Sequence, residues 1–334
     1  MIATGNIAHG SAGAPSPDGM GVPMTATIVI TTKNRKSELA TALRSAVQQM
    51  PRPEIIVIDD GSTDGTSEMV RTEFPDVVVH RCSESLGYIV RRNEGTKLAT
   101  GDVVVSIDDD AEFTATDTVA QTLLEFSSPA IGAVAMPYID VRKSDRINQK
   151  APEQSAVWIL SSYIGTAHAV RKDVFLALGG YREDLVHQGE EMDFCIRMLD
   201  AGYFVRIGNA SPIHHHESER RDFSRMDRYG ARNAILFAWQ NCPLITLPTQ
   251  LGGTTVKVLL WTLDPTRFRI RAAAVIEGFL AMARRRRQPV RLATYRLFRR
   301  LKRDEQLRLD GRALAVVSGA ADVIAHPRVA AEDL

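Results

Sequence analysis

Three adjacent carboxylates, Asp108, Asp109 and Asp110, are the residues whose types and spacing most directly indicate chemistry. They follow residues 103–107 (VVVSI), a β-branched run that predicts a strand buried on both faces. Like charges at the end of a buried strand repel one another unless a counter-charge is present. Mg²⁺ or Mn²⁺ would supply that charge, because these hard cations prefer carboxylate and phosphate oxygens. A solvated acidic turn is the alternative interpretation.

A run of three histidines, His214, His215 and His216, is the second group that could bind a metal. In a strand over residues 211–216, His214 and His216 share one face, and His215 points away from it. We expect one or two of these imidazoles to be ligands and the third to be solvated.

The elements that must position these groups alternate along the first half of the chain. Strands are predicted at residues 27–31, 55–58, 77–80 and 103–107, and helices at residues 37–49 and 88–99. This alternation predicts an α/β fold with a Rossmann-like, mostly parallel sheet that helices cover on both faces. Ligands of such sheets bind at the carboxyl ends of the strands, where the aspartate triplet falls.

The turns after the first two predicted strands limit the ways in which the site can bind a phosphate. The first, residues 31–37 (TTKNRKS), lacks the glycine patterns of dinucleotide binders and of P-loops, so phosphate recognition has to come from a metal and side chains. The second, residues 59–65 (DDGSTDG), is rich in turn-forming residues, and Thr63 or Asp64 is the expected N-cap of the next helix.

Three of these stretches together resemble a known family. Residues 27–35 (TIVITTKNR), 55–66 (IIVIDDGSTDGT) and 85–113, which end in VVVSIDDDAEF, are similar in order and spacing to the N-terminal half of family 2 glycosyltransferases. The resemblance implies the A-type glycosyltransferase fold and a nucleotide-sugar donor. It also implies Mg²⁺ or Mn²⁺ as cofactor, and single displacement with inversion at the sugar.

The resemblance further implies a donor site built mainly from the first half of the chain. Near the nucleotide, the expected residues are Thr31 and Arg35 at the base, Asp59 or Asp60 accepting from the base N–H, and Arg92 and Asn93 at the base or ribose. Asp108 is expected at the ribose or a metal-bound water, with Asp109 beside it. Asp108, Asp110 and His214 are expected to bind the metal that bridges the diphosphate.

The second half would carry the acceptor side. Gly165 would let the backbone approach a ligand closely. Residues 189–197 (GEEMDFCIR) resemble the family's motif for the catalytic base, with Glu191 where the family usually has aspartate and Glu190 beside it in the substrate site. A carboxylate whose pKa is raised by a like-charged neighbour suits proton removal from a hydroxyl. The alternative is an acidic first turn that favours the helix dipole.

The length fits one large domain, or one domain with an appendage. The chain has 334 residues and a formal net charge of +1, so its overall charge does not favour nucleic acid. We expect a disordered tail over residues 1–23, a catalytic domain over residues 24–240 with a donor half (24–113) and an acceptor half (114–240), and a helical extension over residues 241–334. The three cysteines lack metal or disulfide spacing and are expected to be buried thiols in a reducing compartment.

The extension contains a strongly basic stretch. Between residues 266 and 303, thirteen Lys or Arg residues accompany a single acid, Glu277, and apolar residues interleave with them. Basic amphipathic helices fit an anionic membrane surface, and a helical cap with a solvated basic face is the alternative. Arg225, Arg228 and Arg232 form a smaller basic stripe that would clamp an anionic substrate or be solvated.

We therefore predict an inverting, metal-dependent glycosyltransferase of the hexosyl or deoxyhexosyl class that acts on a hydroxyl acceptor in polysaccharide, glycolipid or other glycoconjugate synthesis. No apolar run approaches the ~20 residues that span a bilayer, so the expected location is the cytoplasm or the inner face of the cell membrane. A sugar nucleotidyltransferase and a non-catalytic, membrane-associated nucleotide-sugar binder are the alternatives.

Overall fold

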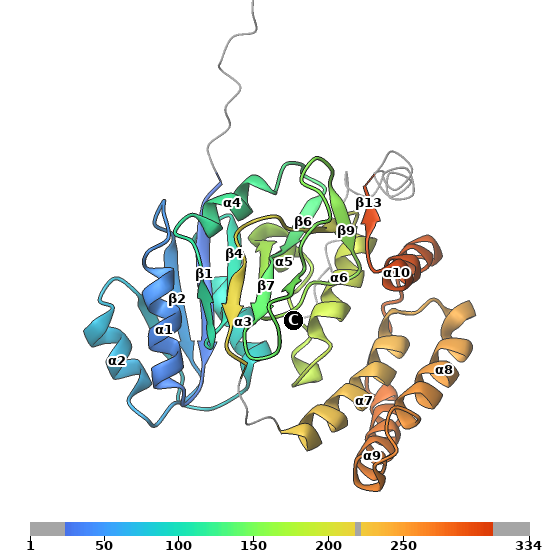
Figure 1. Cartoon of the computed structure of the whole chain (residues 1–334). Coiled ribbons are helices and arrows are strands. Elements are labelled where there is room, and N and C mark those ends of the chain that lie inside the picture. Colours follow the sequence, from blue (N-terminus) through green and yellow to red (C-terminus); the bar gives the residue numbers. More distant parts are fainter. Residues whose placement is uncertain (1–23, 218–221, 310–334) are drawn as a thin grey trace, which may run out of the picture.

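The computed structural model describes residues 24–217 and 222–309 and has an α/β fold (Figure 1). Within these residues, nine strands form the main sheet in the order β13-β9-β11-β6-β10-β4-β1-β2-β3. Four neighbouring parallel strands correspond to those predicted from the sequence: β1 (Ala26–Thr32), β2 (Glu54–Asp59), β3 (Val78–Arg81) and β4 (Val103–Asp108). The predicted Rossmann-like sheet is confirmed, and the predicted tail over residues 1–23 lies outside the described residues.

The other strands of the main sheet come from later in the chain. They are β6 (Ile131–Ala135), β9 (Trp158–Leu160), β10 (Ala167–Arg171), β11 (Phe204–Ile207) and β13 (Leu307–Arg308). β10 is antiparallel to both β4 and β6, and it joins the two halves of the sheet. The carboxyl end of β4 therefore lies beside the amino end of β10, which brings donor-half and acceptor-half residues together.

Both faces of the sheet are covered, as the β-branched strands predict. Along β1, Ile28 and Ile30 belong to one apolar cluster and Val29 to the other, because successive side chains of a strand point to opposite faces. The first cluster includes residues of α1 (Lys36–Ala46), α2 (Thr66–Glu73), α4 (Thr118–Leu124) and α10 (Leu292–Asp304). The second cluster includes residues of α3 (Tyr88–Leu98) and α5 (Lys172–Ala177). Helix α6 (Glu190–Asp200) contributes to both clusters.

Two local expectations about helix ends are corrected. Helix α1 ends at Ala46 rather than near Gln49, because the buried Gln49 amide instead donates to the carbonyl of Ala115, 2.7 Å away, and accepts from the N–H of Val119. The N-cap of α2 is Gly65, whose φ of 82° is left-handed, rather than Thr63 or Asp64. The Asp64 carboxylate still accepts a hydrogen bond from the N–H of Thr66 at 3.1 Å.

A second sheet of four strands among the described residues lies at the end of β4. It consists of β5 (Ala111–Phe113), β12 (Ile213–His215), β7 (Tyr138–Asp140) and β8 (Ile147–Asn148), in that order. β5 begins three residues after β4 ends, and β12 pairs antiparallel with β5 and parallel with β7. This small sheet therefore carries the histidine run to the aspartate triplet.

The C-terminal helices lie on one side of the sheet (Figure 1). α7 (Phe223–Asn241), α8 (Leu247–Leu259) and α9 (Pro265–Met282) group together, with Ala231 and Ile235 of α7 packed against Ala274 and Val275 of α9. α10 instead buries its apolar residues in the main core. Among the described helices, none has the length and apolar character needed to cross a bilayer.

The packing of the helices also shows the surroundings of the α7 arginines and of the three cysteines. Arg228 and Arg232 of the α7 stripe pair with Glu277 of α9, so they join one helix to another. Arg232 is buried, whereas Arg228 remains exposed to solvent. Cys82, Cys195 and Cys242 are buried and unpaired, as expected.

Candidate active site

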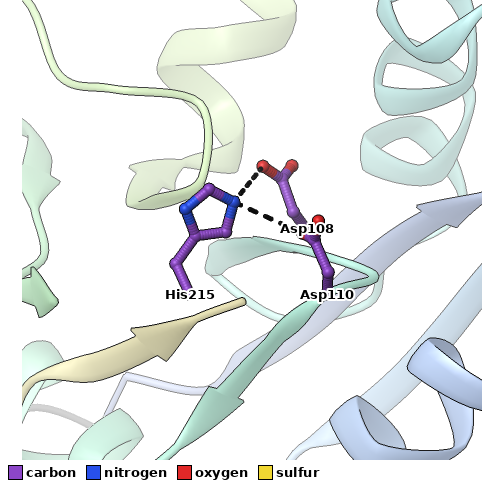
Figure 2. A group of neighbouring side chains, drawn as sticks. All are labelled: Asp108, Asp110 and His215. Carbon is purple, nitrogen blue, oxygen red and sulfur yellow. Dashed lines mark ion pairs between the residues drawn. The ribbon is translucent and has the colours of Figure 1, made fainter. Parts of the chain in front are cut away.

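Asp108 at the end of β4, Asp110 in the turn after it and one histidine of β12 converge at the carboxyl end of the central strands. Nε2 of His215 lies 3.4 Å from Oδ1 of Asp110 and 4.0 Å from Oδ2 of Asp108 (Figure 2). One donor atom from each of the three side chains lies within 4.8 Å of the others. The predicted grouping of Asp108 and Asp110 with a histidine is therefore present, but with a different histidine.

The expectation that His214 joins the aspartates is wrong, and the register of β12 gives the reason. His214 lies opposite Glu112 of β5, whereas His215 lies opposite Asp140 of β7. Because directly opposed residues share a face of the sheet, His214 faces Glu112, with 3.8 Å between Nδ1 and Oε1. His216 shares that side and lies 2.9 Å from the same carboxylate.

Asp140 is a site residue that sequence reasoning missed. Its Oδ1 lies 2.5 Å from Nδ1 of His215, which fixes the ring and directs Nε2 toward Asp108 and Asp110. Carboxylates that hold the second nitrogen of a histidine in this way are typical of metal sites. The available signal was a carboxylate at the end of a short strand, the same pattern that marked the triplet.

Arginines supply counter-charge that the sequence argument assigned to a metal alone. The Arg35 guanidinium contacts Asp109 at 2.9 Å and Asp110 at 2.8 Å, and Arg92 contacts Asp108 at 2.6 Å. Arg35, expected near the nucleotide base, is thus held by the triplet. Thr32 donates to the second oxygen of Asp109 at 2.8 Å, so this middle carboxylate points away from His215.

The two buried aspartates differ in their affinity for protons. Burial raises the pKa of Asp109 to about 7, although Arg35 and Thr32 oppose the shift. Burial also acts to raise the pKa of Asp110, but contacts with His215 and Arg35 outweigh it and lower the pKa to about 2. Asp110 is therefore an anion at neutral pH and offers oxygen ligands of full charge.

These side chains fit a divalent cation such as Mg²⁺ or Mn²⁺. Two carboxylates from the end of β4 and the turn after it meet one imidazole of β12, and the imidazole is already oriented by a further carboxylate. Asp108 is also the least buried of the three aspartates, so a metal held there can still meet a substrate oxygen.

The second pair of carboxylates begins α6. Glu190 is 0% exposed, and neither of its carboxylate oxygens has a hydrogen-bond partner in the described structure. The nearest cation is Arg92, 3.7 Å away. Burial, together with the neighbouring Glu191 carboxylate, raises the pKa of Glu190 well above its usual value. Burial also raises the pKa of Glu191, against the opposing charge of Arg92.

Gly165 provides the space that Glu191 and Arg92 occupy. A Cβ at this position would lie 2.5 Å from Oε1 of Glu191 and 2.7 Å from Nη1 of Arg92. The Gly165 carbonyl accepts a hydrogen bond from Arg92 at 3.0 Å. The close approach expected at Gly165 is therefore made by two side chains of the site itself.

The expected base contacts of Asp59 and Asp60 compete with internal hydrogen bonds. Asp60 accepts from the hydroxyl of Ser85, the N–H groups of Leu86 and Gly87, and Nε of Arg91. These four bonds fill the acceptor capacity of a carboxylate. Asp59 is fully buried and accepts from the N–H of Ser62 and the hydroxyl of Ser67. At Asp60, a base N–H would have to replace one of these bonds.

Asn93 is corrected from substrate contact to structural support. Its amide donates to the carbonyl of Tyr181 and accepts from the N–H of the same residue, both at 2.9 Å. The helix face that carries Asn93 points toward the loop before α6 rather than toward the triplet. Thr31, in contrast, is partly exposed at the end of β1, where the prediction places the base.

The remaining residues of the α6 motif anchor the helix. Asp193 is buried and pairs with Arg182 at 2.5 Å and with Arg197 at 3.0 Å. Arg197 also donates to the carbonyls of Leu178 and Gly180. The motif thus divides into two structural anchors and two glutamates near the site.

Comparisons with known proteins agree with this architecture. A family model described as Glycosyl transferase family 2 matches residues 27–179. A glucosyl-dolichyl phosphate glucuronosyltransferase of Haloferax volcanii is 26% identical over 226 residues, which cover 59% of this chain and 71% of that protein. An O-antigen chain rhamnosyltransferase of Salmonella typhimurium is 25% identical over 221 residues, which cover 60% of this chain and 70% of that protein.

A solved structure is similar over nearly the whole length. The mannosyltransferase of Pyrobaculum calidifontis, in complex with GDP-Man and Mn²⁺, has a TM-score of 0.54 and 20% sequence identity, and the similarity covers 94% of this chain and 90% of that one. At this identity the similarity concerns the fold, which is the A-type glycosyltransferase fold.

Proposed function

We propose that this chain, whose residues 27–179 match the model of Glycosyl transferase family 2, transfers a sugar from a nucleoside-diphosphate donor to a hydroxyl acceptor, with inversion at the anomeric carbon. The observation that carries the proposal is the position of Arg92. This guanidinium contacts Asp108 at 2.6 Å and approaches Glu190 at 3.7 Å. The carboxylates near the leaving group and those near the acceptor are thereby held in one site.

Glu191 acts as the general base in this proposal. Its carboxylate takes the proton from the acceptor hydroxyl, and the hydroxyl oxygen attacks the anomeric carbon from the face opposite the leaving diphosphate. The bond from the anomeric carbon to the diphosphate breaks as the new bond forms, so no covalent enzyme intermediate is needed. The raised pKa of Glu191 suits this role, because a stronger base takes the proton more readily.

Asp108, Asp110 and His215 are the residues that would hold the divalent cation. The chemistry that Mg²⁺ or Mn²⁺ supplies when bound there is neutralisation of the charge on the leaving diphosphate. Asp140 keeps the His215 ring oriented, and Arg35 keeps Asp110 in place. Thr31 and Asp59 lie at the ends of the adjoining strands, where we place the nucleotide base.

We place the acceptor in glycoconjugate synthesis, because the two relatives are transferases for a dolichyl-phosphate glycolipid and for O-antigen. The three buried, unpaired cysteines suit a reducing compartment, which supports the cytoplasm as the site of the reaction. An anionic membrane surface is the proposed macromolecular partner of the C-terminal helices.

A panel of nucleotide sugars tests the reaction. We expect one donor to give release of nucleoside diphosphate that requires Mn²⁺ or Mg²⁺, and NMR of the product to show the inverted anomer. Retention of the donor's configuration would contradict single displacement. Release of pyrophosphate from a nucleoside triphosphate and a sugar 1-phosphate would instead identify a nucleotidyltransferase. A nucleotide that raises Tm with no release from any donor would identify a non-catalytic binder.

A further inference from the structure

The turn between α8 and α9 exposes large apolar side chains in sequence. Leu260 is 76% exposed, Trp261 63% and Leu263 100%. Isolated exposed leucines are ordinary, whereas adjacent exposed apolar residues that include a tryptophan mark an interaction surface. These residues lie outside the site described above and take no part in it.

The outward face of α9 continues this apolar character. Ala274, Val275 and Gly278 face α7, and a Cβ on Gly278 would lie 2.9 Å from the Ile235 side chain. At 100° per residue, the opposite face carries Arg269, Ala273, Ile276 and Leu280, and Phe268 and Phe279 lie beside it; all six are exposed. The outward face of a surface helix is normally polar, but here it has one charge among apolar residues.

Ion pairs hold this surface rigidly on α7. Asp227 of α7 pairs with Arg267 at 2.6 Å and also with Arg271, both on the first turns of α9. Asp264 caps α9 by accepting from the N–H groups of Thr266 and Arg267. The turn between α8 and α9 is therefore held in one conformation, with its apolar side chains exposed.

Aromatic rings and cations meet around the same turn. Lys257 and Arg271 each lie 5.9 Å from the centre of the Trp261 ring. Arg267 lies 5.8 Å from the ring of Phe223, which is itself exposed at the start of α7. Tryptophan and phenylalanine flanked by Lys and Arg form the composition that inserts into the headgroup region of a bilayer.

The positive charge of residues 266–303 favours an anionic partner for this apolar surface. Arg269, Arg284 and Arg286 are exposed, and none has an ion pair within the described residues, while acids are nearly absent from residues 266–303. A second copy of the chain would bring like charges together, whereas an anionic bilayer attracts them. We propose that the α8–α9 turn and the outward face of α9 bind the surface of an anionic phospholipid bilayer, with Trp261 and Leu263 inserted.

This proposal names the part of the chain that meets the membrane partner stated above. It differs from the expectation that the basic helices over residues 266–303 lie on the membrane, because α10 buries Tyr295, Leu297, Phe298 and Leu301 in the core. Membrane binding is measured without any donor or acceptor, so its failure would leave the transferase reaction untouched.

Flotation of the full chain with vesicles of phosphatidylcholine and phosphatidylglycerol tests the proposal. We expect binding that weakens with salt, and Trp261→Ala/Leu263→Ala to lower the partition coefficient by about tenfold or more, since two large apolar side chains lose their burial. Leu124→Ala, which removes an equally exposed leucine from α4, is the matched control and should bind like the parent.

Fluorescence gives a second readout. Insertion of Trp261 should shift its emission to the blue on vesicle addition, and Trp261→Phe should abolish the shift while retaining binding. Unchanged flotation of Trp261→Ala/Leu263→Ala, with Tm equal to that of the parent, would overturn the proposal. So would a concentration-dependent dimer that the same variant abolishes in the absence of vesicle binding, because the face would then be a self-association interface.

Discussion

Arg92 is the residue through which the two halves of the site meet. It lies 5.0 Å above the Tyr88 ring, donates to the Gly165 carbonyl, and faces Asp108 on one side and Glu190 on the other. Its charge offsets part of the repulsion among these carboxylates, and its planar fork fixes their spacing. A single helix position thus couples the end of β4 to the start of α6.

The first prediction separates the two glutamates. Glu191→Gln should lower kcat by about 10²–10⁴, the usual contribution of a general base, with little change in donor KM. Glu190→Gln should keep most activity, because burial raises the pKa of Glu190 so that it keeps its proton and glutamine resembles the protonated acid. The pH profile should fall on the acid side at a pH above about 4.3, the usual pKa of glutamate, because burial raises the pKa of Glu191. An inactive Glu190→Gln beside an active Glu191→Gln would reverse the assignment.

The second prediction concerns the histidine run. EDTA should abolish turnover, and Mn²⁺ should restore it. His215→Ala should weaken Mn²⁺ activation by about 10–100-fold, whereas His214→Ala, which faces Glu112, should leave it within about twofold. Mn²⁺ titration of the purified variants, followed by electron paramagnetic resonance, measures this without turnover. Equal losses in both variants would contradict the positions of the two rings.

At the scale of elements, α7 holds the loop before α6. The Asn233 amide donates to the carbonyls of Leu185, His187 and Gln188, the loop that leads into Glu190 and Glu191. On its other side, α7 holds α9 through Asp227 and packs against it through a small apolar cluster. The helix therefore links the site to the surface that we propose for membrane binding.

The third prediction tests this link. Asp227 is buried, and Arg267 and Arg271 lower its pKa below the usual value. Asp227→Asn should lower Tm by a few degrees and raise hydrogen exchange in α9, because both guanidinium groups lose their anion. Asp76→Asn, from an exposed pair with Arg52, is the matched control and should be nearly neutral. Unchanged exchange in α9 would contradict the anchoring role of Asp227.

At the scale of the whole molecule, the C-terminal helix α10 belongs to the same core as the sheet. Four apolar residues of α10 are buried in the cluster that contains Ile28 and Ile30 of β1. β13 adds a strand at the edge of the main sheet, beside β9. The predicted boundary near residue 240 is therefore a boundary in the chain's composition, and it remains a prediction as a boundary between folding units.

The fourth prediction follows from this shared core. A chain that ends at residue 290 loses Tyr295, Leu297, Phe298 and Leu301, whose burial is worth about 6–12 kcal/mol. Because this is comparable to the total stability of a domain, we expect the shortened chain not to unfold cooperatively. A chain that ends at residue 309 retains α10 and is the control. A cooperative transition near the parental Tm in the shorter chain would show that α10 is dispensable.

The fifth prediction concerns pH and stability. Burial, with the charge of Arg92 adding to it, lowers the pKa of His168 to about 3. The unfolded chain takes up this proton below about pH 6.5, but the folded chain does so only near pH 3, so stability present at neutral pH is lost as pH falls through this window. This group alone gives a slope of about 1.4 kcal/mol per pH unit. Urea unfolding of His168→Gln between pH 7 and 4 should show a smaller slope than the parent, and His80→Gln, an exposed histidine, should not.

The sequence by itself determined the four parallel strands β1 to β4, the helices between them, the fold class and the resemblance to family 2 glycosyltransferases, because these follow from local periodicity and from motifs of adjacent residues. It also located Asp108, Asp110 and Glu191 near strand and helix ends. It did not determine which histidine faces the aspartates, since alternation along β12 defines two faces and only the register with β5 and β7 decides which one meets the site. Tertiary packing also decided that Arg35 and Asn93 pair with distant protein groups. Such partners lie far away in the chain, so no local pattern can specify them.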